Sequence, residues 1–206
     1  MSKDEFQRHL SVSRETIDRL DKYEALITKW NPKINLVASS TLEDIWVRHF
    51  LDSAQLASFA PNSGMWLDLG SGGGFPALVI ASMISDTHPE VSFTLVESDT
   101  RKAVFLRTVI RELELNAKVL SERIEKIPAQ NANVLSARAL DTLEKLVGYA
   151  KIHLNQDGTA FFPKGSSHKN ELEQARETWS FDVKTIPSIT DPTAAIFSIK
   201  DIQRAK

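Results

Sequence analysis

The chain contains no cysteine among its 206 residues. Without a thiol it can form no disulfide, no thiolate zinc site and no cysteine nucleophile, and we predict no metal site. It also lacks any apolar run of about eighteen residues, the length that a membrane-spanning helix needs. The first residues, Met1 to Phe6, are mostly polar and do not resemble a secretion leader. We therefore expect a soluble, cytoplasmic protein.

The chain also lacks a basic excess, because 25 Lys and Arg against 27 Asp and Glu leave a formal charge of −2. Non-specific binding to nucleic acid rests on many cationic contacts to phosphate, so a protein that coats nucleic acid indiscriminately is excluded. A local basic face remains compatible with this charge. Its candidates, which can equally be ordinary solvated charges, are Lys29, Lys33, Arg48, Arg101, Lys102, Arg107 and Arg111.

The length and the hydrophobic share of 42% suit one substantial domain, residues 1–206. Residues 1–60 lack strand signals and predict a helical extension on the substrate side. Ser13 can cap a first helix that Asn31-Pro32 should end, and Thr41, followed three residues later by Asp44, can cap a second.

Residues 65–206 alternate between strand and helix patterns and predict a cofactor-binding α/β core. The expected strands are 65–69, 91–96, 117–120, 133–137 and 159–162, and the expected helices are 77–84, 99–115, 143–154 and 168–178. Residues 155–158 should form a turn, and segments 181–186 and 194–199 a C-terminal antiparallel hairpin. We predict a Rossmann-like fold with a mostly parallel seven-stranded sheet covered on both faces.

Four of the eight glycines fall within Gly70-Ser71-Gly72-Gly73-Gly74, directly after the apolar strand that contains Asp68. The glycines permit positive φ angles and close approach of a ligand, and Pro76 suits the first turn of a helix. Phe75 stands where a dinucleotide site has its third glycine. Asp68 would repel a pyrophosphate but attract an ammonium group, so we favour S-adenosylmethionine over NAD. The alternative is a tight turn that only packs strand against helix.

Glu97 ends the second strand, some 25 residues after the glycine turn. In nucleotide-binding α/β folds an acid at this place accepts both ribose hydroxyls. The alternative is a solvated side chain paired with Arg101.

Arg138 follows the fourth strand, at the edge of the sheet where ligands bind. No Asn or Asp followed by Pro-Pro, the pattern of amino-group methyltransferases, is present there. Arginine donors suit the N7 and O6 acceptors of guanine. Methylation of pyrimidine C5 normally needs a thiolate, which this chain lacks. Guanine N7 carries a lone pair and no proton, so positioning alone can promote its methylation without a general base.

Two polar clusters in the extension, residues 31–36 and 48–53, are candidates for a substrate pocket. Arg48 and Asp52 can instead form a helix-surface ion pair. His49 can be a hydrogen-bonded core or capping residue.

Five motifs together resemble the glucose-inhibited division protein B family of bacterial 16S ribosomal RNA (guanine-N7) methyltransferases. They are W-N-P-K-I-N-L (30–36), R-H-F-L-D-S (48–53), L-D-L-G-S-G-G-G-F-P (67–76), S-A-R-A-L (136–140) and P-K-G (163–165). The resemblance implies methyl transfer from S-adenosylmethionine to guanine N7 in the decoding-region loop of the small-subunit RNA. The sequence departs from the family pattern at three positions, Val37, Ala77 and Ala195.

The resemblance also implies a set of site residues. Those for the cofactor are Asp68, Gly70, Ser71, Gly72, Gly74, Phe75, Glu97, Arg123, Ile124, Glu125 and Arg138. Those on the substrate side are Asn35, Arg48, His49, Arg138 and Lys164, with Asp52 orienting Arg48 or His49.

The expected partner is 16S ribosomal RNA, as the small ribosomal subunit or its assembly intermediate. We expect no membrane partner and a monomer. Two alternatives stay open, a small-molecule methyltransferase and a non-catalytic module that binds the cofactor or RNA. Steep salt dependence would favour an RNA substrate over a small molecule, and turnover would exclude the non-catalytic module.

Overall fold

The computed structural model describes residues 2 to 205. The elements along the chain are α1 (Ser2–His9), α2 (Arg14–Ile34), η1 (Ser39–Thr41), η2 (Trp46–Leu51), α3 (Asp52–Ala54), η3 (Ala57–Phe59), β1 (Gly64–Leu69), α4 (Ala77–Ile84), β2 (Val91–Val96), α5 (Thr100–Glu112), β3 (Ala117–Leu120), η4 (Ile124–Lys126), β4 (Ala132–Ala137), α6 (Leu143–His153), β5 (Leu154–Lys164), α7 (His168–Thr178), β6 (Trp179–Pro187) and β7 (Ala195–Arg204).

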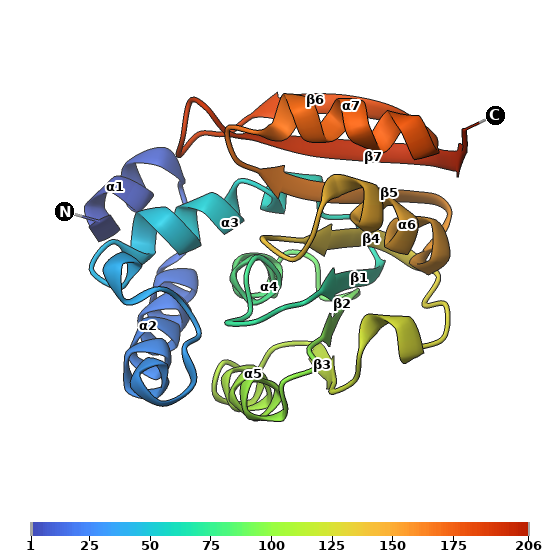
Figure 1. Cartoon of the computed structure of the whole chain (residues 1–206). Helices are drawn as coiled ribbons and strands as arrows, with labels where there is room; N and C mark the ends of the chain where they lie inside the picture. The colour runs from blue at the N-terminus through green and yellow to red at the C-terminus, as the bar shows by residue number, and fades with distance from the viewer. Residues whose placement is uncertain (1, 206) are drawn as a thin grey trace.

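One seven-stranded sheet crosses the molecule in the order β3-β2-β1-β4-β5-β7-β6 (Figure 1). Strands β1 to β5 pair in parallel, whereas β7 is antiparallel to both β5 and β6. The predicted mostly parallel sheet and terminal hairpin are therefore confirmed. The strand order reverses between β1 and β4, and ligands of open α/β sheets bind beyond the carboxyl ends of the strands at such a point.

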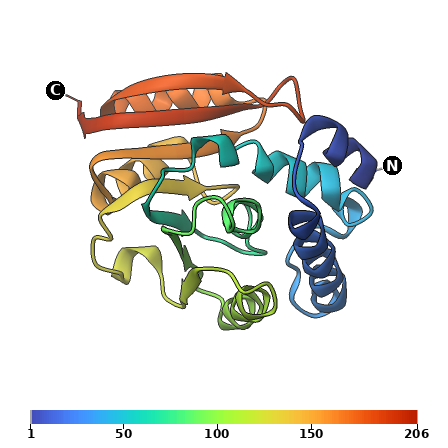
Figure 2. The same ribbon diagram turned by 180° about the vertical axis from the view of Figure 1, so that it is seen from behind.

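Apolar side chains cover both faces of the sheet. One cluster joins α1, α2, α4 and α5 to the sheet and includes Phe6, Tyr23 and Leu78. The other lies beneath α6 and α7 and includes Leu146 and Phe162. The loop between β6 and β7 lies beside the N-terminal helices in opposite views, although it is far from them in sequence (Figures 1 and 2). Within residues 2–205, no helix is both long and apolar enough to cross the bilayer.

The first helix begins as predicted but ends later. Ser13 accepts a hydrogen bond from the Thr16 amide and is the N-cap of α2. The prediction that Asn31-Pro32 ends the helix is wrong, because α2 continues to Ile34. Asn31 remains helical, and its side chain accepts bonds from the amides of Leu36 and Val37 just beyond the helix. These bonds stabilise the turn past Pro32.

The predicted cap at Thr41 is also wrong. Thr41 ends a short 3-10 turn, and its hydroxyl donates to the Ala38 carbonyl and contacts His49 instead of capping a helix. The helical segment starts later, at Trp46.

Most core boundaries are confirmed, with three corrections. Strand β7 continues to Arg204, beyond the predicted 199. Residues 155–158 do not form a turn but a bulge inside β5, because Ala132 pairs with Leu154 and Val134 pairs with Thr159. Helix α5 ends at Glu112, short of the predicted 115. All three corrections lie away from the carboxyl ends of β1 and β4.

Candidate functional site

The glycine turn runs from the end of β1 into α4, as the sequence predicts. Gly70, Gly72 and Gly74 have φ angles of 64°, 53° and 93°. At Gly74 a Cβ atom would collide with the hydroxyl of Tyr23, so this position requires glycine for space as well as for conformation. The backbone of the turn is therefore open to a ligand on one side and held by α2 on the other.

Asp68 is fully buried at the end of β1, below this turn. Its Oδ1 accepts a 2.6 Å bond from Ser136 Oγ, which in turn accepts a bond from the Trp66 indole. Its Oδ2 has no partner among the described residues. Burial raises the pKa of the carboxyl to about 7, against the effect of Ser136. An unsatisfied buried carboxylate oxygen is a ready partner for a ligand ammonium.

Glu97 is 8% exposed, and both of its oxygens bind backbone amides. Oε2 accepts from Gly72 at 2.8 Å and Oε1 accepts from Asp99 at 2.8 Å. Arg101 pairs with Asp99 rather than with Glu97, which excludes the solvated ion-pair alternative. Each carboxylate oxygen keeps a second lone pair for a ligand hydroxyl.

A cavity of about 500 Å³ opens beside the glycine turn, within the size range of small-molecule sites. We call it the cofactor cavity. The predicted cofactor residues that line it are Gly70, Ser71, Gly72, Phe75, Glu97, Arg123, Ile124, Glu125 and Arg138. Asp68 and Gly74 lie in the same turn region but are not among the lining residues. The glycine turn, the ends of β2 and β4 and the segment after β3 thus meet at one place.

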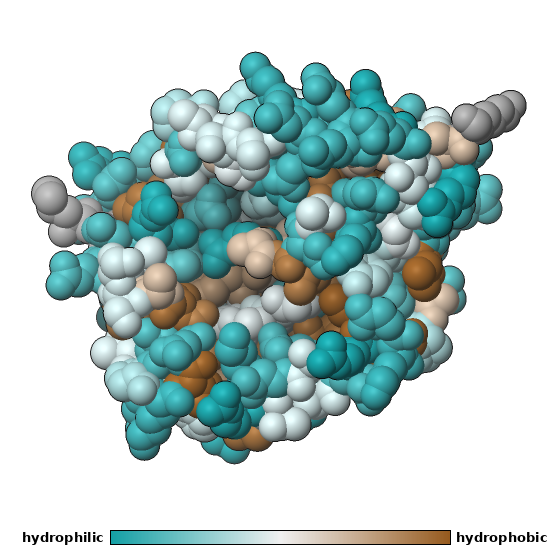
Figure 3. Space-filling model, in the orientation of Figure 1, coloured by the Kyte–Doolittle hydropathy of each residue, from teal (hydrophilic) through white to brown (hydrophobic). Residues whose placement is uncertain are grey.

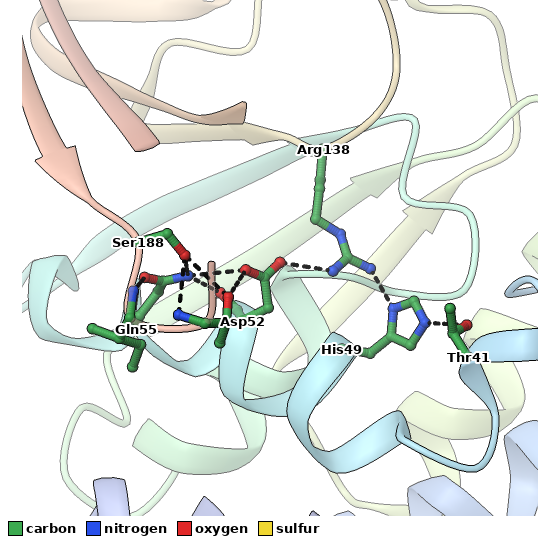
Figure 4. Close-up of polar contacts among 8 residues, drawn as sticks. Thr41, His49, Asp52, Gln55, Arg138 and Ser188 are labelled. Carbon is green, nitrogen blue, oxygen red and sulfur yellow. Dashed lines mark hydrogen bonds and ion pairs between the residues drawn. The ribbon is translucent and has the colours of Figure 1, made fainter. Parts of the chain in front are cut away.

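Arg138 stands at the centre of a polar network (Figure 4). Its Nη1 donates to Asp52 Oδ2 at 3.0 Å, and its Nη2 donates to His49 Nδ1 at 2.9 Å. The guanidinium also lies over the Phe75 ring, 5.0 Å from its centroid. The prediction that Asp52 orients Arg48 or His49 is wrong, because among the described residues its carboxylate bonds neither of them and accepts from Arg138, Gln55 and Thr190 instead. The alternative of an Arg48–Asp52 ion pair is not formed either. Two acceptors, Asp52 and His49, each take one N–H of the guanidinium, and its other three N–H groups remain for a ligand.

His49 is neutral and saturated with hydrogen bonds. Burial, followed by the charges of Arg138 and Arg48, lowers its pKa to about 3. Arginine only donates, so Nδ1 is the acceptor and the ring proton resides on Nε2, which lies 2.8 Å from Thr41 Oγ1. The ring stacks on Phe75 with centroids 4.9 Å apart. His49 therefore has no lone pair left to act as a general base.

A second cavity of about 760 Å³ adjoins the first and shares five lining residues with it, His49, Arg138, Ala139, Leu140 and Asp141. We call it the acceptor cavity. Its far wall includes Thr190 and Asp191 of the β6–β7 loop. In the orientation of Figure 1, the molecular surface is hollowed near its middle, and both hydrophilic and hydrophobic residues border the hollow (Figure 3). Arg138 thus lies where the two cavities meet.

The remaining substrate-side predictions have different outcomes. Arg48 is exposed, lines the acceptor cavity and forms no ion pair within the described residues. Lys164 lines the same cavity, but its Nζ already donates to Glu171 at 2.7 Å and to the Asp141 carbonyl at 2.8 Å. Asn35 is the left-handed C-cap of α2 and lines neither cavity.

Several lining residues escaped the sequence reasoning. Ser98 directly follows Glu97 and was within reach of the same argument, whereas Lys102, considered for a basic face, lies at the cofactor cavity. Tyr149 carries no local signal, yet its hydroxyl donates to Glu125 at 2.6 Å across the cofactor cavity. No group of three or more potential metal-ligating side chains gathers within residues 2–205.

Comparisons with known proteins agree with this geometry. Residues 16–196 match the family model described as rRNA small subunit methyltransferase G. The chain is 48% identical over 195 residues to the ribosomal RNA small subunit methyltransferase G of Ruegeria sp., covering 95% of each chain. It is 52% identical over 192 residues to the protein of the same name from Cereibacter sphaeroides, covering 93% of each.

Similarity to solved structures concerns the fold. A SAM-dependent methyltransferase from Aquifex aeolicus superposes with a TM-score of 0.57 at 14% identity, over 87% of this chain and 97% of that one. The fold is therefore that of S-adenosylmethionine-dependent methyltransferases, as the sequence predicted.

Proposed function

The chain belongs to the rRNA small subunit methyltransferase G family, and from this premise we propose a role for each part of its site in methyl transfer to guanine N7 of 16S ribosomal RNA. It is an S-adenosylmethionine-dependent ribosomal RNA methyltransferase. The single observation that carries the assignment of roles is the position of Arg138, which lines both the cofactor cavity and the acceptor cavity.

The residues around the glycine turn fit the cofactor. Asp68 Oδ2, buried and without a partner among the described residues, would bind the ammonium group, and Glu97 would bind the ribose hydroxyls. Arg123, Ile124 and Glu125 would lie along the adenine. When bound, S-adenosylmethionine supplies an electrophilic methyl group on a sulfonium sulfur.

On the acceptor side, Arg138 would donate to guanine O6 with the N–H groups that Asp52 and His49 leave free. The N7 lone pair then stays available for the methyl group. His49 moves no proton, since both of its nitrogens are bonded, and N7 has none to lose. Catalysis therefore rests on positioning and on fixed charges rather than on acid–base chemistry.

Contacts to the RNA backbone are assigned to exposed cations near the acceptor cavity. Arg48 is exposed at its edge, and Lys164 would reach a phosphate only if it exchanged Glu171 for that ligand. Asn35 would meet the RNA outside the cavity. We further propose that the enzyme acts as a monomer in the cytoplasm, where the small subunit assembles, and light scattering of the purified protein tests the monomer.

The test is methyl transfer from labelled S-adenosylmethionine to small ribosomal subunits that lack the modification. Borohydride and aniline then cleave the RNA at N7-methylguanine, and a single new cut in the decoding-region loop is expected. Because Arg138 also lines the cofactor cavity, the assay uses saturating S-adenosylmethionine, at which Arg138→Ala should still remove the cut. Arg204 is a cation that lines neither cavity, so Arg204→Ala should leave the cut unchanged. Cofactor binding without a cut on subunits or on free RNA would contradict the proposal and favour a small-molecule acceptor or a non-catalytic module.

A further inference from the structure

The loop between β6 and β7, residues 188–194, is bound to the helical segment that carries Asp52. Gln55 Oε1 accepts a 3.2 Å bond from the Ile189 amide, and Gln55 Nε2 donates to the Asp52 carbonyl at 2.8 Å. Within the loop, Ser188 Oγ accepts a bond from the Thr190 amide at 3.2 Å. A turn more than 130 positions away in sequence is thereby held against α3.

Thr190 makes the contact with most consequence. Its hydroxyl donates to Asp52 Oδ1 at 2.9 Å, and Gln55 Nε2 lies 3.0 Å from the same oxygen. The other oxygen, Oδ2, accepts from Arg138 at 3.0 Å. The two oxygens of the Asp52 carboxylate thus have different partners. Oδ1 is bound by the loop and by Gln55 at the end of α3, and Oδ2 binds the guanidinium of Arg138 (Figure 4).

The Asp52–Arg138 pair is sheltered, since the side chains are only 21% and 17% exposed. Rotation of the carboxylate would therefore move or release the guanidinium, and few water molecules can replace the lost bond. Substitution of the Thr190 hydroxyl leaves Oδ1 with Gln55 Nε2 as its one remaining partner among the described residues, so the carboxylate is held less firmly. The guanidinium would then be positioned less well over Phe75.

We propose that Thr190 is a positioning residue for methyl transfer, which holds Asp52 and through it fixes Arg138 between the two cavities. The proposal rests on the role of Arg138 proposed above. Because the same loop walls the acceptor cavity, the segment that would meet the RNA also holds the arginine that would meet the base. Neither the cofactor cavity nor the glycine turn includes a residue of this loop.

The test compares Thr190→Val with Thr190→Ser in methyl transfer to unmodified small subunits. Valine keeps the shape and removes the hydroxyl, so kcat should fall about tenfold, the size expected for one hydrogen bond to a charged group. The Kd for S-adenosylmethionine and the KM for subunits should change less than about twofold, because the contacts that set them remain. Serine keeps the donor and should restore kcat.

A matched control lies three residues further along the loop. Among the described residues the Thr193 hydroxyl bonds only to Asp191, and Thr193 lines neither cavity. Thr193→Val should therefore leave kcat unchanged. The positioning role is wrong if Thr190→Val leaves kcat as high as Thr193→Val does. It is also wrong if Thr190→Val and Thr190→Ser lower kcat and thermal stability to the same extent.

A double-mutant cycle separates action through Asp52 from a general effect on the loop. The Thr190 hydroxyl also bonds Ser188 Oγ at 3.0 Å, but only its bond to Asp52 leads to Arg138. In an Asp52→Ala background, Thr190→Val should therefore lower kcat less than about twofold further. A full tenfold loss in that background would overturn the proposal. Inactivity of the unmodified enzyme on subunits would contradict the proposed function itself, whereas an active enzyme insensitive to Thr190→Val contradicts only the role of Thr190.

Discussion

Asp68 and His49 show how the environment of single residues prepares the site. Asp68 is buried, and its Oδ2 has no hydrogen-bond partner among the described residues. Ionisation of the carboxyl is therefore unfavourable unless a cation binds beside it, which is why burial raises its pKa. His49 is kept neutral by burial and by neighbouring guanidinium groups. Asp68 can therefore still bind a cation, whereas both ring nitrogens of His49 are already hydrogen-bonded.

Cofactor binding should depend on pH through Asp68. Burial raises the pKa of its carboxyl to about 7, with Arg138 favouring and Glu97 opposing ionisation. A protonated carboxyl does not attract an ammonium group, so affinity is lost as pH falls through this pKa. We expect the association constant for S-adenosylmethionine to fall about tenfold between pH 7.5 and pH 6, as calorimetry would measure.

The control for this prediction is Asp68→Asn, which cannot ionise. It should bind the cofactor more weakly than the unmodified enzyme and with a flat profile over the same range. Parallel profiles for the two proteins would contradict the assignment of the pH dependence to Asp68.

The turnover number kcat, in contrast, should not vary with pH through the titration of His49. Because the pKa of His49 lies at about 3, its charge does not change near neutrality. With cofactor and subunits saturating, we expect kcat to be constant from pH 6 to pH 8, measured from single-turnover methyl transfer. A step near pH 6.5 that His49→Asn abolishes would mean that the imidazole takes part in proton transfer.

At the scale of elements, helix α2 supports the glycine turn from behind. Tyr23 is buried, donates to the Gly73 carbonyl and stacks between Phe50 and Phe75. The N-terminal helix therefore fixes the backbone that contacts the cofactor, in addition to shaping the substrate side. This link was not visible in the sequence.

Tyr23→Phe should weaken this support. The ring still packs, but the Gly73 carbonyl loses its buried partner, at a cost of about 1–2 kcal/mol in the free energy of unfolding. Because that carbonyl belongs to the cofactor turn, affinity for S-adenosylmethionine should also fall several-fold. Urea denaturation and calorimetry measure the two effects.

Ser13→Ala is the control on the same helix, since it removes the N-cap of α2 far from the turn. It should cost about 1 kcal/mol of stability and leave cofactor affinity unchanged. Equal losses of affinity in both variants would show that stability alone, and not the turn, determines binding.

At the scale of the whole molecule, the N-terminal extension and the α/β core share one apolar cluster. Phe6, Leu20 and Tyr23 of the extension pack in the same cluster as Leu78 and Trp66. Removal of the extension would expose that face of the sheet layer. We propose that residues 1–206 therefore fold as a single domain.

Unfolding should accordingly be one cooperative transition. Tryptophans lie in both parts, Trp30 and Trp46 in the extension and Trp66 and Trp179 in the core. Urea curves from tryptophan fluorescence and from far-ultraviolet circular dichroism should coincide. Two separated transitions would indicate that the extension unfolds independently.

Much of the fold and part of the site could be predicted because the signals are local. The strand and helix at Gly70–Gly74, the placement of Asp68 and Glu97, and the hairpin all follow from spacing within a few residues. The boundary errors come from side-chain hydrogen bonds between residues five to eight positions apart, which hydrophobic periodicity does not reveal. The Asn31 side chain accepts hydrogen bonds from the backbone amides of Leu36 and Val37, beyond Pro32. The Thr41 hydroxyl is hydrogen-bonded to His49 Nε2 and does not cap a helix.

The sequence by itself determined the class of fold, the cofactor turn and the residues that carry charge near it, since backbone conformation and hydrophobic periodicity are written in neighbouring positions. Only the tertiary structure decided that Asp52 belongs to Arg138 rather than to Arg48, that Lys164 is paired with Glu171, and that Thr190 completes the network. These contacts join residues 86 and 138 positions apart or depend on competition between partners. No local pattern encodes such a choice, because it is made by the packing of elements and not by their sequence.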